Sequence, residues 1–382
     1  MTAAPSSPTM PAILGRAALD KLIFVLSSAG YQVIGPTVSE AVVVYGPIQT
    51  AAELPVGWVD QQDGGSYRLV KSDRQVVFDH VVGPHSWKRY LYPAVQRLWR
   101  AQRRGRDFLG ITQDTATPRY AFLGVRSCEL HAMQIQDRVF NQGAFIDPGY
   151  QARRAAVFIV AVNCARPAGT CFCASMHTGP QVSQGFDLAL TELIDTERHE
   201  FLVEVGSEQG AAILARLPHR TATRAAIIAA ETVLATAAKA MGRAMVPEVN
   251  TLLKNNLEHP RWDAVAQRCL SCANCTLVCP TCFCTTVEDT TALAGQMTER
   301  WRKWDSCFTL DFSYIHGGSI RHEGRSRYRQ WITHKLSTWY DQFGSSGCVG
   351  CGRCITWCPV GIDITEEARA IRDNGGKSHG AE

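Results

Sequence analysis

The spacing of apolar positions changes along the chain and predicts alternating strands and helices. Short uninterrupted apolar runs, such as AVFIVAV at 156–162, are typical of strands that are covered on both faces. Longer stretches with apolar residues three or four positions apart predict amphipathic helices. We expect strands within 31–48 and at 67–70, 75–78, 120–125, 156–162, 188–194 and 201–205. We expect helices at 13–30, 91–104, 129–140, 220–241 and 249–257.

The predicted helix at 91–104 carries a group of basic residues towards its end. A solvated helix face explains them, because cations are favoured near a helix C-terminus. The alternative is a docking surface for a negatively charged partner. The residues are Arg97, Arg100, Arg103 and Arg104.

The net charge indicates no particular partner, whereas the cysteine content indicates metal-binding chemistry. The 382 residues carry a formal net charge of +4, which by itself points to neither nucleic acid nor a membrane. No stretch reaches the ~18 apolar residues that cross a bilayer, and the N-terminus lacks the pattern of a signal peptide. The 15 cysteines are clustered in a long chain, unlike those of a small secreted disulfide scaffold. We therefore expect a cytoplasmic protein without a membrane span, whose thiolates bind metal.

Two cysteine runs dominate the C-terminal third of the chain. CLSCANCTLVCP at 269–280 and CVGCGRCITWCP at 348–359 both follow the spacing C-x2-C-x2-C-x3-C-P. This is the bacterial ferredoxin pattern for 4Fe-4S clusters. Structural zinc usually uses two C-x2-C pairs with a longer gap, and a disulfide framework does not suit a reducing compartment. Two runs therefore indicate two 4Fe-4S clusters.

The ligands are expected to cross between the runs. In two-cluster ferredoxins the fourth cysteine of each run binds the other cluster. The first cluster would take Cys269, Cys272, Cys275 and Cys358. The second would take Cys348, Cys351, Cys354 and Cys279. Small residues between the ligands let the backbone approach the sulfides closely; these are Ser271, Ala273, Gly350 and Gly352.

Four more cysteines lie in the α/β region and match the ligand count of a further cluster. They are Cys128, Cys164, Cys171 and Cys173. Cys128 and Cys164 each follow a predicted strand, at the strand end where open α/β sheets bind ligands. Their spacing is irregular, so a third 4Fe-4S cluster is a candidate beside a zinc site and unligated or redox-active thiols.

A smaller set follows the first run and consists of Cys282, Cys284 and Cys307. Free cysteine is commonly buried, so these thiols are interpreted first as packing beside the clusters. The alternative is a metal site, in the form of a cluster with an open iron.

No pattern for substrate chemistry accompanies the cysteines. There is no G-x-G-x-x-G after a strand and no H-E-x-x-H. The histidines are scattered, and we expect structural or surface roles for them. The sequence therefore indicates a protein that transfers electrons through its clusters and has no catalytic residues of its own.

These features define an α+β fold class and a division of the chain. An N-terminal α/β domain precedes a ferredoxin-like dicluster domain, which has a large insertion between its cysteine motifs. The Ala/Ser/Pro-rich N-terminus and the polar, Gly-rich tail are expected to be disordered or flexible. The boundaries are 1–11, 12–248, 249–367 and 368–382.

The chain resembles the beta subunit of cytoplasmic NiFe sulfhydrogenases and the related iron–sulfur subunit of anaerobic sulfite reductase. The resemblance runs from about residue 82 to 364. It departs from the family pattern at Ser127, Glu129 and His177, while the cysteines are intact. The stretches that carry it include GPHSWKRYLYP at 83–93, LGVRSCELHAMQIQDRVF at 123–140, VNCARPAGTCFCASMHTGP at 162–180, CLSCANCTLVCPTCFCTTVED at 269–289 and CVGCGRCITWCPVGIDITE at 348–366.

This resemblance implies an electron relay. A flavoprotein subunit that oxidises NAD(P)H would lie on one side, and a hydrogenase small subunit or a siroheme sulfite reductase subunit on the other. Two functions of other classes compete with it. A redox-sensing nucleic-acid-binding module would use the basic segments 97–106 and 321–335, but the modest net charge disfavours it. An enzyme with an open cluster iron near Cys282 would need acid–base groups that the sequence does not show.

Overall fold

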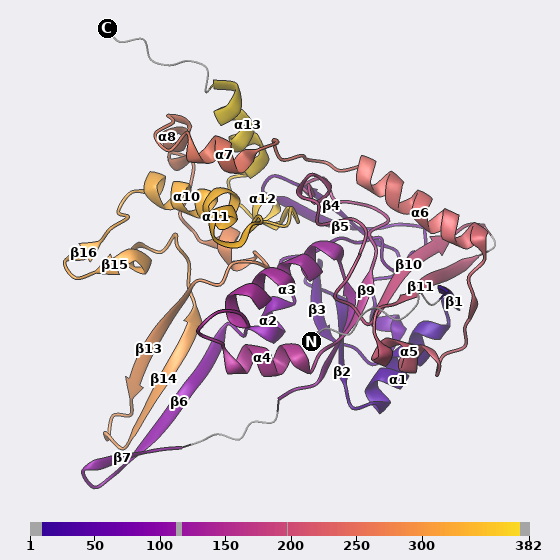
Figure 1. Ribbon diagram of the computed structural model, residues 1–382, viewed down its shortest axis with the longest axis horizontal. Coiled ribbons are helices and arrows are strands. Elements are labelled where there is room, and N and C mark those ends of the chain that lie inside the picture. Colours follow the sequence, from indigo (N-terminus) through magenta and orange to yellow (C-terminus); the bar gives the residue numbers. More distant parts are fainter. Residues whose placement is uncertain (1–9, 112–116, 197, 375–382) are drawn as a thin grey trace.

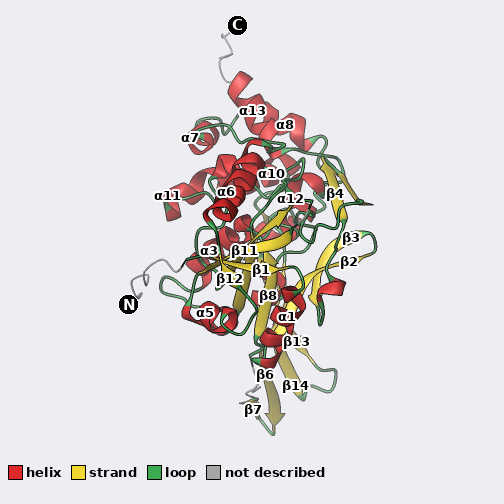
Figure 2. Cartoon of the chain, turned by 90° about the vertical axis from the view of Figure 1, so that its right-hand side faces the viewer, coloured by secondary structure: helices red, strands yellow, loops and turns green. Residues whose placement is uncertain are grey.

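The computed structural model describes residues 10–111, 117–196 and 198–374 (Figure 1). The predicted disordered segment 1–11 therefore lies outside the described residues, except for its last two. Figure 1 shows the α/β region at the centre and right, the cysteine-rich helices at the upper left, and a long β arm at the lower left. In the turned view of Figure 2, the helices α7, α8 and α13 lie at the top, the large sheet in the middle and the arm at the bottom.

An eight-stranded mixed sheet forms the centre of the α/β region. Its strand order is β12-β1-β11-β10-β9-β8-β2-β3, in which β10, β9, β8 and β2 are parallel. Strand β9 is buried along its whole length, as a parallel strand covered by helices on both sides should be. The strands are β1 Ala12–Gly15, β2 Gln32–Ser39, β3 Val42–Pro47, β8 Tyr120–Val125, β9 Phe158–Val162, β10 Leu188–Ile194, β11 His199–Val205 and β12 Arg220–Thr221.

Helices cover both faces of this sheet. On one face, Leu22 and Leu26 of α1 pack in one cluster with Val160 and with residues of α5. On the other face, Met133 of α3 packs with Ile159 and with residues of α4. Helix α6 lies over β10 and β11. The helices are α1 Ala18–Ser28, α2 Lys88–Leu91, α3 Ser127–Phe140, α4 Pro148–Ala155, α5 Glu208–Leu214 and α6 Arg224–Lys239.

The cysteine-rich region is built from short helices around an aromatic core. Trp262, Tyr328 and Trp331 are buried there together with Cys348. A π-helical turn at His334–Thr338 continues α10 into α11. The helices are α7 Val249–Lys254, α8 Arg261–Ala266, α9 Asn274–Leu277, α10 Gly324–Thr333, α11 Trp339–Phe343, α12 Arg353–Thr356 and α13 Ile364–Asn374.

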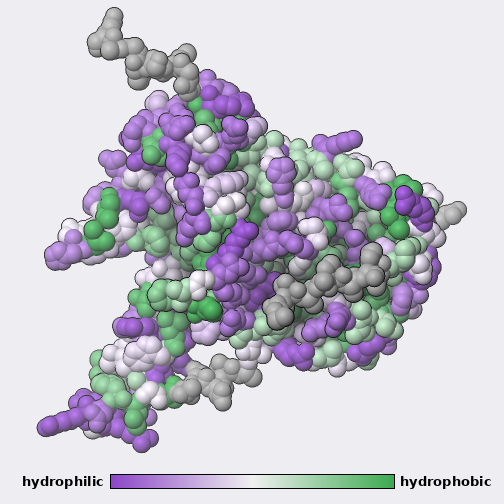
Figure 3. Space-filling view, in the orientation of Figure 1, coloured by the Kyte–Doolittle hydropathy of each residue, from purple (hydrophilic) through white to green (hydrophobic). Residues whose placement is uncertain are grey.

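The arm is a four-stranded sheet that takes strands from both halves of the chain. Its order is β13-β14-β6-β7, and β6 pairs antiparallel with β14. Exposed apolar side chains gather on it among charged ones, including Trp99 and Phe108 (Figure 3). The strands are β6 Val95–Arg104, β7 Asp107–Gly110, β13 Thr285–Thr291 and β14 Met297–Trp304.

The predicted helix at 91–104 is therefore wrong. Pro93 cannot continue the short helix α2, and the chain leaves it as the extended strand β6. Arg97 donates a hydrogen bond to Glu299 across the strand pair at 2.9 Å, and Arg100 lies 3.3 Å from the same carboxylate. Arg97 and Arg100 thus form cross-strand ion pairs, while Arg103 and Arg104 are exposed on the strand, and the interpretation as a solvated helix end does not apply.

The strand predicted at 75–78 is also absent from the described structure of that segment. The backbone N–H groups of Val77 and Phe78 donate to the Glu192 carboxylate at 2.7 and 2.9 Å, so they join no neighbouring strand. The other predicted strands are found. Smaller elements are the hairpin β4 Trp58–Asp63 with β5 Ser66–Lys71, the pair β15 Tyr314–Ile315 with β16 Gly318–Ser319, and the 3-10 turns Ala51–Glu53, Ala174–Met176 and Leu310–Ser313.

Several predicted helices have different ends. The stretch at 13–30 begins as strand β1 before α1, and the stretch at 220–241 begins as strand β12 before α6. Helix α7 stops at Lys254. The tail predicted to be flexible from 368 onward is helical in α13 as far as Asn374, because Ala368 and Ile371 are buried against the aromatic core.

Candidate iron–sulfur sites

The two cysteine runs share one backbone conformation. Ser271 and Gly350, at equivalent positions, have φ values of 52° and 64°. Ala273 and Gly352 likewise have φ values of 67° and 76°. Each run then enters a short helix, α9 or α12. Two left-handed residues so close together turn successive N–H groups inward, which favours an anionic ligand.

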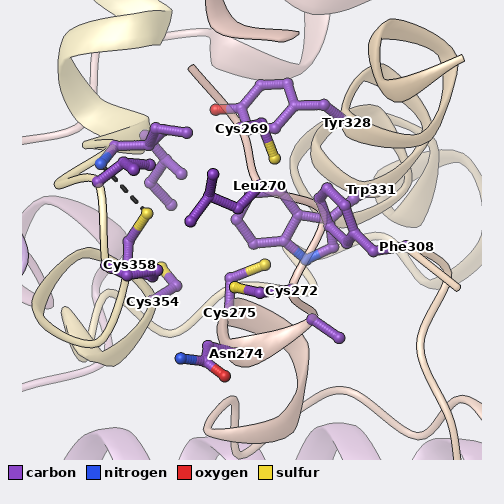
Figure 4. A pocket seen from close by; sticks show the side chains of 15 residues that line it. Cys269, Leu270, Cys272, Asn274, Cys275, Phe308, Tyr328, Trp331, Cys354 and Cys358 are labelled. Atoms are coloured by element: carbon purple, nitrogen blue, oxygen red, sulfur yellow. Dashed lines mark hydrogen bonds between the residues drawn. The ribbon is translucent and has the colours of Figure 1, made fainter. Parts of the chain in front are cut away.

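The first cavity collects cysteines from both runs (Figure 4). Cys269, Cys272 and Cys275 from the first run line it together with Cys358 from the second. Their side chains surround a common space in Figure 4, with Phe308, Tyr328 and Trp331 beside them. Cys354 of the second run lines the same cavity, so the crossed ligand assignment stays a prediction. Cys272 is the exposed member of the set.

Backbone N–H groups already point at the sulfur atoms. The N–H of Ser271 donates to Cys269 Sγ at 3.4 Å, and the N–H of Gly350 donates to Cys348 Sγ at 3.5 Å. The N–H of Ile362 donates to Cys358 Sγ at 3.3 Å. Such bonds stabilise thiolates and set the reduction potential of a bound cluster.

The second set consists of Cys279, Cys348, Cys351 and Cys354. Burial raises the pKa of the Cys354 thiol, and the other three cysteines raise it further. Burial raises the pKa of Cys348 to about 12. Without a cluster these two thiols are therefore protonated near neutral pH, and cluster binding must release their protons.

Two buried lysines fit a negatively charged group at this second set. Lys335 Nζ donates to Thr281 Oγ1 at 2.7 Å, to the Gly347 carbonyl at 3.3 Å and to Cys279 Sγ at 3.4 Å. Lys88 Nζ donates to the carbonyls of Cys279 and Cys282 at 3.0 and 2.9 Å. A buried ammonium group with neutral partners is costly. The thiolates of a bound cluster would supply the compensating charge.

The α/β cysteines form the third set, at the edge of the large sheet. Strands β8 and β9 are adjacent and parallel, so their ends bring Cys128 and Cys164 together. Cys128, Cys171 and Cys173 pack in one cluster with Cys351 of the second run. Burial raises the pKa of Cys171 to about 12, and Cys164 and Cys351 add to it. The third set therefore adjoins the second.

Glycines let the second run lie directly on the third set. A Cβ at Gly350 would come within 2.7 Å of the backbone of Cys173, and one at Gly352 within 2.4 Å of the Thr170 carbonyl. Gly350→Ala is expected to destabilise the protein by more than the about 1–2 kcal/mol of a left-handed alanine, because backbone must also move. Chemical denaturation monitored together with iron content measures this.

Gly295→Ala is the matched control for that substitution. Gly295 has a φ of 66°, but nothing lies within 4 Å of its Cβ position. Gly295→Ala is expected to lose only the about 1–2 kcal/mol of unfolding free energy that a left-handed alanine costs, and to keep all iron. Equal losses in the two variants would show that close packing at Gly350 contributes nothing.

A fully buried ion pair joins the residues beside these two sets. Arg353 follows Cys351 by two positions, and Glu129 follows Cys128 directly. Their charged groups lie 2.6 Å apart, and both side chains are at most 1% exposed. Glu129 also accepts hydrogen bonds from Tyr45 and Trp87, at 2.8 and 2.9 Å. The sequence marks Glu129 only as a departure from the family pattern and does not indicate that it pairs with Arg353.

His80 makes the protein sensitive to acid. Burial lowers its pKa well below the usual 6.5, and Arg126 and Arg166 lower it further. Below about pH 6.5 the unfolded chain takes up a proton that the folded chain cannot, so stability falls as pH falls, by at most ~1.4 kcal/mol per pH unit. His80→Gln is expected to lose less stability than wild type between about pH 7.5 and 5.5 in thermal melts. Parallel pH profiles for the two proteins would contradict this.

The remaining three cysteines line a separate cavity of about 400 Å³. Cys282 lies next to Cys279, and Cys284 lies next to Cys307. The contact with Cys307 lowers the pKa of Cys284 to about 7. The interpretation of these thiols as packing beside the clusters does not account for the cavity that they face.

Two kinds of feature are absent from the described residues. In the described part of the chain, no three His, Cys, Asp or Glu side chains come close enough together to hold a single metal ion. No helix within the described residues is long and apolar enough to cross a membrane.

The comparisons with known proteins agree with this chemistry. Residues 268–362 match the family described as 4Fe-4S dicluster domain, so the C-terminal region is an iron–sulfur domain. The chain is also 32% identical over 267 residues to sulfhydrogenase 2 subunit beta of Pyrococcus furiosus, which covers 69% of this chain and 77% of the relative. It belongs to the family of sulfhydrogenase beta subunits, as the motifs predict, and is an iron–sulfur electron-transfer subunit.

Proposed function

We propose that this protein relays single electrons between a flavoprotein subunit that oxidises NAD(P)H and the small subunit of a NiFe hydrogenase. The identity to a sulfhydrogenase beta subunit supports the hydrogenase over the siroheme sulfite reductase as the second partner. The 15 free cysteines suit a reducing compartment, so we place the complex in the cytoplasm. Bound 4Fe-4S clusters would supply one-electron redox chemistry.

The continuity of the three cysteine sets carries this proposal. Cys354 belongs to the second set and also lines the first cavity. Cys351 belongs to the second set and packs against Cys128, Cys171 and Cys173 of the third. The sets therefore form one unbroken series from the C-terminal region into the α/β region, as a relay between two partner subunits needs.

The proposed ligands follow the three sets. The first and second clusters would use the crossed cysteines of the two runs, and the third would use Cys128, Cys164, Cys171 and Cys173. The protein supplies the N–H donors at sulfur, the buried lysines and an apolar lining. These exclude water, hold the thiolates in place and compensate their charge.

We also propose a domain boundary near residue 248, between the α/β region and the dicluster region. The two parts do not pack as independent units. Strand β6 of the first pairs with β14 of the second, and the Glu129–Arg353 ion pair crosses between them. A rigid connection of this kind holds the cysteine sets at fixed separations.

Anaerobic purification of the native complex tests the function. We expect the protein to copurify with a flavoprotein and a hydrogenase, and NAD(P)H to bleach its iron–sulfur absorption only when the flavoprotein is present. H₂ should bleach it only through the hydrogenase. Copurification with a siroheme protein, or an iron–sulfur absorption that neither reductant bleaches, would overturn the proposal.

A further inference from the structure

The cavity beside Cys282, Cys284 and Cys307 belongs to none of the three sets described above. Its volume is about 400 Å³, and its wall includes all three thiols and one histidine, His334. The cysteines come from two segments, the loop that leads into β13 and the loop that follows β14. Pairing of these strands fixes the segments next to each other: the N–H of Asp305 donates to the Cys284 carbonyl at 2.8 Å.

His334 reaches this wall from a π-helical turn. The turn at His334–Thr338 interrupts the α-helical ladder between α10 and α11, and such turns are frequent at functional sites. The imidazole packs against Trp339, with ring centroids 5.3 Å apart. The His334 ring lines the cavity together with the three thiols.

The cationic and apolar side chains of the cavity wall suit a negatively charged group. Lys335 and Arg321 line the same cavity, and Lys335 is buried. Trp331 and Trp339 form its apolar part. Thiolates are soft donors that iron–sulfur clusters use, and imidazole also binds iron.

We propose that Cys282, Cys284, Cys307 and His334 bind a further iron–sulfur cluster of the 4Fe-4S class. The three thiols and the imidazole line one cavity, and a cluster binds such donors on different iron atoms. The inference rests on the proposed function, since it adds a site to the same relay. An imidazole in place of one thiolate removes negative charge and is expected to raise the reduction potential, as histidine ligation does in Rieske centres.

Iron content of the anaerobically isolated protein gives the first test. We expect about 16 iron atoms per chain in the wild type and about 12 in Cys307→Ala, which would retain the other three clusters. Thr285→Ala, on the wall of the same cavity, should keep the wild-type content. About 12 iron atoms in the wild type, with Cys284 and Cys307 found as a disulfide or as free thiols, would overturn this inference and leave the proposed function standing. About 8 or fewer would overturn the third site as well.

The histidine ligand has its own spectroscopic readout. Pulsed EPR of reduced protein labelled with ¹⁵N-histidine should show nitrogen coupled to a cluster, and His334→Cys should abolish that coupling while keeping the iron. His322→Ala, an exposed histidine elsewhere in the insertion, should leave the coupling unchanged. Nitrogen coupling that survives in His334→Cys, or none in the wild type, would overturn the assignment. His334→Cys also guards against a folding defect, because it supplies an alternative ligand.

Discussion

Replacing Cys275 by serine is expected to remove one complete cluster, which lowers the iron content by about four atoms per chain. The thiol is buried in the first cavity, where Cys269, Cys272 and Cys358 surround it. Serine nearly preserves the shape but is a poor ligand for iron. Since cluster binding contributes to folding free energy, the variant should also melt at a markedly lower temperature. Iron analysis and thermal melts of anaerobic protein measure both effects.

Pairs of substitutions decide whether the ligands cross. If Cys275 and Cys358 hold the same cluster, the double serine variant loses about four iron atoms, as each single variant does. If Cys275 and Cys279 hold different clusters, their double variant loses about eight. The opposite pattern would show that each run binds its own cluster. Asn274→Ala, which changes a neighbouring residue of the cavity wall, should keep the wild-type iron content.

Arg353→Ala is expected to cost about 3–5 kcal/mol of unfolding free energy, because it leaves the Glu129 carboxylate buried without its cation. Tyr45 and Trp87 still donate to that carboxylate, but neither carries charge. The loss should appear in chemical denaturation as a lower midpoint. It should also loosen the contact between the second and third cysteine sets, so iron should be lost from the variant faster than from wild type.

A double variant and a surface control complete this test. Arg353→Met with Glu129→Gln removes both charges and is expected to be clearly more stable than Arg353→Ala alone, since buried pairs are often replaceable as a unit. Arg300→Ala breaks the exposed pair with Asp289, where both side chains are about half exposed, and should behave like wild type. If Arg353→Ala matches Arg300→Ala, the buried pair does not hold the two parts together.

Features that depend on neighbouring residues are the ones that the sequence predicts best. Both cysteine runs take left-handed turns at Ser271, Ala273 and the glycines, because a ligand every third residue leaves the loop few other conformations. Strands β8 and β9 are recognisable because burial on both faces makes each of them apolar throughout. Their parallel pairing then explains why Cys128 and Cys164 meet at one sheet edge.

Features that depend on distant parts of the chain cannot be predicted in this way. The local pattern predicts a helix where β6 lies, since the partner strand β14 that stabilises β6 comes about 200 residues later and leaves no local signal. The role of Arg97 becomes clear only when its cross-strand ion pair with Glu299 is known. Arg353 looks like any basic residue until Glu129 is placed beside it. His334 gives no spacing signal, since the cavity that it lines forms only when α10 folds over the loop after the first run.

The close contact between Gly350 and the Cys173 backbone has a consequence for how the protein matures. With crossed ligands, neither cluster can be completed before the ribosome has synthesised Cys354, so the nascent chain carries open thiols for most of translation. Once the loop around Gly350 closes over Cys171 and Cys173, the third set is sealed beneath it. If the α/β cysteines hold a cluster, it must be inserted before this loop docks, and a cell that is short of iron would then accumulate chains in which the loop has not yet docked.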